Sequence, residues 1–126
     1  MHDHTAADDV EVRAAPVLSV DDLDRALDHY RALGFLVSRY DDGYGYAAWR
    51  GLELHLAVSD GHDSGRQGAV VFLHVPDADE VAGRWRAAGV GRTTLPTDRP
   101  WRQREGAHVD PWGNVLRFGS PLRSGG

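Results

Sequence analysis

The chain has 126 residues, of which 41% are hydrophobic and 26% are charged, and its formal net charge is −5. This length and balance are typical of one folded domain with its own core. The acidic balance argues against nucleic acid as a partner, because phosphate binding needs a basic surface. The chain has no cysteine, which excludes disulfides and thiolate metal sites.

No apolar run approaches the roughly 18 residues of a membrane span, and the polar start MHDHTAADD does not have the pattern of a secretory signal. We therefore expect a cytoplasmic protein without a membrane partner. The negative net charge favours a cationic ligand, although it equally serves solubility.

The first repeated unit, module one, is predicted over about residues 13–58, after a flexible tail over 1–12. It opens with a strand that ends at Val20. Asp22 stands at the N-cap position of a helix, and Gly34 stands at the left-handed position that ends one. Three short β-rich runs follow the helix, at residues 35–40, 44–50 and 52–58. Module one therefore reads βαβββ.

A second copy of this pattern begins 55 residues later. The stretch VLSVDDLDRALDHYRALGF (17–35) aligns without gaps with FLHVPDADEVAGRWRAAGV (72–90). The aspartate and glycine caps coincide, and Tyr30 meets Trp85, one large aromatic residue for another. So many matches at one offset, in apolar and capping positions alike, indicate a duplicated unit.

The second unit, module two, is predicted over about residues 69–120. A Gly/Ser/Asp-rich linker over 59–68 precedes it, and a C-terminal tail over 121–126 follows it. Its strands are expected at 70–75, weakly near 91–95, and at 103–109 and 114–118. The fold class is α+β, a single domain over residues 13–120 made of two βαβββ modules.

Three stretches carry a resemblance to a known family: APVLSVDDLDRALDHYRALGF (15–35), LELHL (52–56) and RPWRQREGAHVDPWGNVLRF (99–118). They resemble the glyoxalase/bleomycin resistance/dioxygenase group, also called the vicinal oxygen chelate superfamily, and most closely its bleomycin-resistance branch. The resemblance implies curved sheets that form open half-barrel clefts at a homodimer interface, with an N-terminal strand exchanged near Pro16. It also implies capture of a drug without chemical change.

Enzymes of this group bind a divalent metal through His, Glu or Gln on inward-facing strands, since such cations need several converging ligands. The positions that the resemblance assigns to these ligands hold Ala15, Val70 and Arg117, none of which coordinates a metal in this role. His55 lies near the remaining position, but one imidazole does not make a catalytic metal site. We expect no metal site, no catalytic residues and no cofactor, with any metal arriving inside the bound drug.

The aromatic residues are the strongest candidates for ligand contacts. Strand alternation puts Tyr44 and Tyr46 on one face and Trp49 on the other. Trp101 precedes the strand at 103–109, and Trp112 sits in the turn after it. The resemblance aligns Tyr44 and Trp101 with two aromatic residues that sandwich the planar part of a drug.

His55, Arg104 and Glu105 are candidate polar contacts in the same cleft. Alternation allows only one of Arg104 and Glu105 to face inward. The segment PWRQRE has one residue more between Trp101 and Arg104 than the bleomycin-resistance pattern, so the direction of the indole stays open.

These observations predict a homodimeric antibiotic-binding protein that sequesters a bleomycin-type, or similar planar or cationic, natural product. An enzyme of the same fold acting on a small oxygenated substrate is the main alternative, and a metal-free proton transfer by Glu105 or His55 belongs to it. A ligand-sensing module that works on another protein is the second alternative.

Overall fold

The structure is a computed structural model that describes residues 11–59, 61–63 and 68–122. Residues 1–10 of the predicted N-terminal tail lie outside the described residues. So do residues 60 and 64–67 of the linker and residues 123–126 of the C-terminal tail.

Module one forms a four-stranded sheet with one helix, as the sequence predicts. Its elements are β1 (Val17–Val20), α2 (Leu23–Leu33), β2 (Leu36–Asp41), β3 (Tyr44–Trp49) and β4 (Leu52–Val58). The strand order is β1-β4-β3-β2, with β1 parallel to β4 and the other neighbours antiparallel.

Module two repeats this topology. Its elements are β5 (Val70–His74), α3 (Ala78–Ala88), β6 (Arg92–Thr93), β7 (Thr97–Arg99), β8 (Gln103–Val109) and β9 (Val115–Pro121). The strand order is β5-β9-β8-β6, and β7 also pairs with β8. The weak strand predicted near 91–95 is two short strands, because Pro96 between them has no N–H to donate to a ladder. Strand β9 runs three residues beyond the predicted end.

The two helices begin and end at the predicted caps. The Asp22 side chain accepts a hydrogen bond from the backbone N–H of Arg25, and Asp77 caps α3 in the same way. Gly34 and Gly89 end the helices with φ of 108° and 72°, values that favour glycine. Both helices have 11 residues, and within the described chain no helix is long and apolar enough to cross a bilayer.

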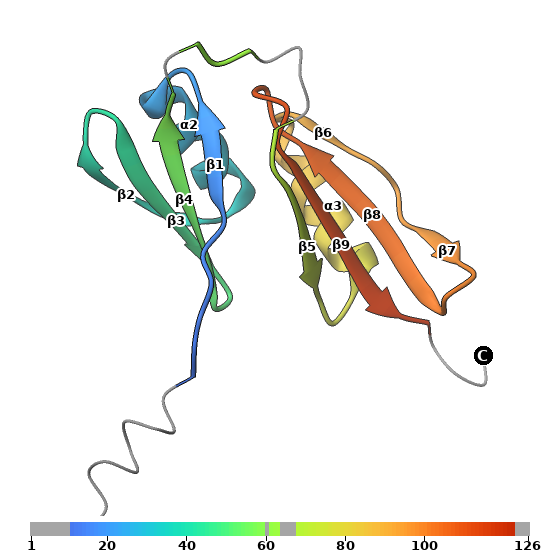
Figure 1. Ribbon diagram of the computed structural model, residues 1–126. Coiled ribbons are helices and arrows are strands. Elements are labelled where there is room, and N and C mark those ends of the chain that lie inside the picture. The colour runs from blue at the N-terminus through green and yellow to red at the C-terminus, as the bar shows by residue number, and fades with distance from the viewer. Residues whose placement is uncertain (1–10, 60, 64–67, 123–126) are drawn as a thin grey trace, which may run out of the picture.

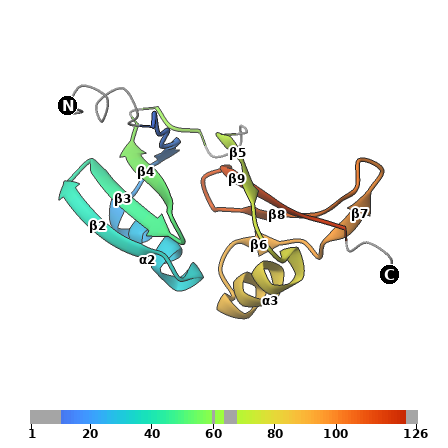
Figure 2. The ribbon, with the colours of Figure 1, turned by 90° about the horizontal axis from the view of Figure 1, so that it is seen from below.

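The helices lie beneath the two sheets and between them, as Figures 1 and 2 show. Tyr30 of α2 and Trp85 of α3 are fully buried, and Phe35 contacts both rings, at centroid distances of 5.4 Å and 6.3 Å. This aromatic core covers one face of each sheet. No described element covers the other face, so each sheet has an uncovered face.

The DPWGN turn between β8 and β9 joins the modules. The Tyr30 hydroxyl donates to Asp110 over 2.8 Å, and burial above all raises the pKa of this hydroxyl. The fully buried Asn114 donates from its Nδ2 to the carbonyl of Ser19 and accepts at its Oδ1 from the N–H of Ala69. The turn therefore serves the architecture, because its polar side chains bond to both modules.

Candidate ligand-binding site

The uncovered face of the first sheet carries an aromatic group that we call the tyrosine–histidine cluster, made of Tyr44, Tyr46 and His55. Tyr46 and His55 lie opposite each other on β3 and β4, with ring centroids 5.0 Å apart at 88°. The Tyr44 hydroxyl is 2.7 Å from His55 Nδ1, and the other ring nitrogen is 2.7 Å from a Glu53 oxygen. Because a carboxylate only accepts, a neutral His55 donates to Glu53 and accepts from Tyr44.

The uncovered face of the second sheet carries another group, the tryptophan–arginine cluster: Phe72, Arg99, Trp101, Glu105 and Arg117. The Trp101 indole N–H donates to Glu105 Oε2 over 2.6 Å, and Arg117 donates to Glu105 Oε1 over 2.7 Å. The Arg99 guanidinium lies over the Trp101 ring at 4.7 Å, and that of Arg117 lies over Phe72 at 5.3 Å. Trp101 itself is 53% exposed.

These donors keep Glu105 charged. The Trp101 hydrogen bond, followed by the hydrogen bond and charge of Arg117, holds the pKa of Glu105 below its usual range. A charged carboxylate is a poor proton donor at neutral pH, and both of its oxygens are already bonded. The arrangement suits holding a ligand better than general acid–base chemistry.

The turn before β8 decides where the indole of Trp101 lies. Arg99 pairs with Gln103 across a three-residue loop, in which Arg102 has a φ of 67°. A three-residue hairpin loop that ends in a left-handed residue accommodates the additional residue of PWRQRE without breaking the ladder. The Trp101 side chain then lies over the face that Glu105 shares.

The residues at the family's metal positions do not fit a metal. Ala15 and His55 line one pocket of about 290 Å³ at the start of β1. Val70 lies on β5, and Arg117 brings a positive charge to the position of the closing carboxylate. Within the described chain, no group of three or more His, Cys, Asp or Glu side chains is placed to hold an ion.

Arg104 lies on the helix side of the second sheet, away from Glu105. Its guanidinium bonds to Asp79 of α3 and to Asp98 of β7, each over 2.9 Å. The alternation rule therefore selects Glu105 for the uncovered face, and Arg104 does not join either cluster.

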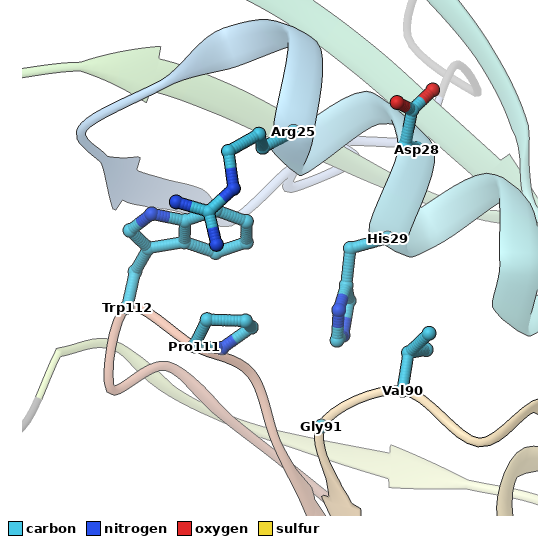
Figure 3. A pocket seen from close by; sticks show the side chains of 7 residues that line it. All are labelled: Arg25, Asp28, His29, Val90, Gly91, Pro111 and Trp112. Atoms are coloured by element: carbon cyan, nitrogen blue, oxygen red, sulfur yellow. The ribbon is translucent and has the colours of Figure 1, made fainter.

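Trp49 and Trp112 line two pockets between the modules and belong to neither cluster. The pocket of Trp49 also includes Phe72 of the tryptophan–arginine cluster, whereas that of Trp112 includes no residue of either cluster. Trp49 contacts Trp85, with ring centroids 5.3 Å apart, and lines a pocket of about 490 Å³ beside β5. Trp112 is only 2% exposed and lines a pocket of about 410 Å³. Figure 3 shows Trp112 and Pro111 from the β8–β9 turn facing Arg25 and His29 of α2.

Sequence reasoning missed Arg99 and Phe72. Both lie at the start of stretches already singled out, Arg99 in RPWRQRE and Phe72 in the second repeat, but neither was given a role, because an arginine in a short edge strand reads as surface. The only available signal was the two-residue spacing from Arg99 to Trp101, which acquires meaning once the turn between them is known. Phe72 reads as a core residue, but β5 turns it toward Arg117 on the uncovered face.

Known proteins resemble this chain in sequence and in structure. A protein from Mycolicibacterium smegmatis, itself described as uncharacterised, is 34% identical over 108 residues, which are 85% of this chain and 91% of that protein. The crystal structure of a bleomycin resistance determinant encoded on transposon Tn5 superposes with a TM-score of 0.81 at 24% identity, covering 88% of this chain and 98% of that one. A bleomycin-binding protein complexed with bleomycin gives 0.79 at 25% identity, covering 87% and 98%.

The family assignment follows from the sequence match. The model of the Glyoxalase/Bleomycin resistance protein/Dioxygenase superfamily matches residues 3–118, most of the chain. The duplicated βαβββ architecture agrees with it. This chain therefore belongs to the glyoxalase/bleomycin resistance protein/dioxygenase superfamily.

Proposed function

We propose that this protein binds a planar natural-product antibiotic of the bleomycin type in the cytoplasm and sequesters it without changing it chemically. One combined observation supports this best. The family's metal positions hold side chains that do not coordinate a metal, and the two clusters occupy the sheet faces around them. Where the enzymes of the family place metal ligands, this chain has Ala15, Val70 and Arg117. Aromatic rings and hydrogen-bonding groups gather on the same uncovered faces. No cofactor is needed, and a metal enters only as part of the drug.

The proposed binding unit is a homodimer. The tyrosine–histidine cluster and the tryptophan–arginine cluster belong to different sheets, so a second copy is needed to set one cluster opposite the other. Val17 and Leu36, on the uncovered side of the first sheet, are 51% and 81% exposed, and contact with a partner chain would bury them. Residues 11–16 run away from β1 (Figure 1), which suits an arm exchanged at Pro16.

Capture depends on stacking and does not require turnover. Each aromatic contact with a planar ring contributes about 0.5–1.5 kcal/mol beyond the buried area. Two walls, Trp101 from one chain and Tyr44 from the other, would hold a flat ring system between them. Such a protein protects a cell in proportion to its concentration, because each cleft removes one drug molecule.

Fluorescence titration tests the proposal. We expect bleomycin to quench tryptophan emission of the wild type at two sites per dimer. Trp101→Ala should lose most of the affinity, while Trp49→Phe, which changes a tryptophan outside both clusters, should keep it. Equal affinity in the wild type and Trp101→Ala, or no binding of bleomycin-type compounds, would refute the proposal.

Metal analysis tests the enzyme alternative. We expect the purified protein to carry no stoichiometric divalent metal and the recovered drug to have an unchanged mass after incubation. One tightly bound Mn, Fe, Ni or Zn ion per chain, resistant to chelator, would favour an enzyme of the same fold.

A further inference from the structure

A pocket beside β7 lies on the uncovered face of the second sheet. Aromatic stacking of a drug gives no role to the charged side chains that line it. Its volume is about 450 Å³, and Leu95, Arg99, Glu105 and Arg117 are among the residues that line it. Two guanidinium groups and one carboxylate therefore share one pocket.

The carboxylate is fully engaged by neighbours. Glu105 accepts from Trp101 at one oxygen and from Arg117 at the other, over 2.6 Å and 2.7 Å. Its lowered pKa means that it is ionised at neutral pH, and this one negative charge faces the positive charges of both Arg117 and Arg99. No second carboxylate among the described lining residues balances Arg99.

Arg99 is held in place without using its hydrogen-bond donors. Its guanidinium lies 4.7 Å from the centre of the Trp101 ring, a cation–π contact that leaves the N–H groups available. Within residues 11–59, 61–63 and 68–122, this guanidinium makes no hydrogen bond or ion pair. By contrast, Arg50 and Arg104, which are also at the surface, each bind an acid over 2.9 Å.

Trp101 is not among the lining residues but stands beside the pocket, in contact with Arg99 and Glu105. We infer that the ligand of this pocket is a planar aromatic carboxylate, whose carboxylate binds Arg99 and whose ring extends to the neighbouring Trp101. The inference goes beyond the proposed function, because it assigns an anionic ligand to a pocket of the same face. A guanidinium offers paired donors that match the two oxygens of a carboxylate. The net charge of −5 favours a cation, but charges more than about 10 Å away are screened by salt, so Arg99 decides locally.

Three probes with one ring system test the inference: 2-naphthoate, 2-naphthamide and 2-naphthylmethylammonium. Binding is followed by NMR through the indole N–H signal of Trp101, assigned with Trp101→Phe. We expect the carboxylate to bind about tenfold more tightly than the amide, the size of one charge-assisted hydrogen bond, and the ammonium to bind most weakly.

Arg99→Gln should remove the preference for naphthoate over naphthamide while leaving the affinity for the amide unchanged. Arg102→Gln is the matched control, because it removes the same charge from the neighbouring turn outside the pocket. It should keep the preference. If the arginines acted only through their charge at long range, both variants would lower the affinity for naphthoate equally. That result would overturn the inference.

The remaining outcomes are equally decisive. Tightest binding of the ammonium probe, or no binding of any probe, overturns the inference. Bleomycin capture together with a preference for the ammonium probe leaves the proposed function standing and refutes the carboxylate. A naphthoate preference that depends on Arg99, without any bleomycin capture, supports the carboxylate and refutes the proposed drug.

Discussion

The paired histidines between the modules make stability depend on pH. His108 of β8 is fully buried, and its Nε2 lies 2.9 Å from Nε2 of His29 on α2. One nitrogen must donate and the other accept, which requires the accepting ring to be neutral. His108 also bonds to the Thr93 hydroxyl over 2.7 Å. Protonation of the accepting ring would turn its Nε2 into a second donor and break the pair, and a charge on either buried ring is opposed by burial.

The magnitude follows from the shift of the pKa. Burial above all, and then the neighbouring His29, lowers the pKa of His108 from 6.5 to about 3, and burial also lowers that of His29 although Asp110 opposes it. The unfolded chain therefore binds more protons between about pH 6.5 and pH 3, and the free energy of unfolding falls as the pH falls through this window. The slope from His108 approaches about 1.4 kcal/mol per pH unit, a loss of about 2–3 kcal/mol between pH 6 and pH 4.

Urea unfolding at a series of pH values measures this slope. His108→Gln keeps an amide that bonds to neighbours and does not titrate, so we expect a shallower slope between pH 6 and pH 4 than in the wild type. The matched control is His74→Gln, at an exposed histidine, which should leave the slope unchanged. Carboxylates that titrate below pH 5 affect all three proteins alike. Equal slopes in the wild type and His108→Gln would refute the assigned role of the pair.

Three further changes have defined outcomes. Asn114→Ala removes buried hydrogen bonds that join the modules, and the free energy of unfolding should fall by about 2–4 kcal/mol in urea titrations; an unchanged midpoint would contradict the role of the turn. Gly45→Ala brings a Cβ to 2.9 Å from the carbonyl oxygen of Ser38 and should cost about 1–3 kcal/mol. The Cβ of Gly83→Ala in α3 meets no atom within 4 Å, so this change should instead raise the free energy of unfolding by about 0.4–1 kcal/mol. If the free energy of unfolding changed in the same direction in both glycine variants, this account of the packing would be wrong. Chelator treatment should leave the thermal midpoint of the wild type unchanged, and a clear drop would reveal a structural metal.

The sequence alone was sufficient for the duplicated architecture. Helix α2 and helix α3 begin and end 55 residues apart, between the predicted aspartate and glycine caps. These features are local, because caps, apolar spacing and glycine positions act through residues close in the chain. For the same reason, alternation placed Tyr44 and Tyr46 together and set Arg104 apart from Glu105.

The grouping of the candidate site needed the tertiary structure. Trp49 and Trp112 were predicted as ligand contacts, with Trp49 on the opposite face of its strand from Tyr44 and Tyr46. They line pockets between the modules, because their places depend on how the helices pack under the sheets. Arg99 and Arg117 became part of the site only when the turn at 100–102 brought the indole over Glu105.

The local charge of the site also depends on the fold. The composition gives a net charge of −5, which favours a cationic ligand. Net charge is a sum over the whole chain, so it does not show which charges lie at the site. In the folded chain Trp101 and Arg117 hold the Glu105 carboxylate by hydrogen bonds, and no described acid makes a hydrogen bond or ion pair with the guanidinium of Arg99. The sequence thus determined the modules and led us to predict which residues stand at the family's metal-ligand positions. The tertiary structure decided which side chains share a pocket, because distances between strands, not spacing along the chain, set which charges meet.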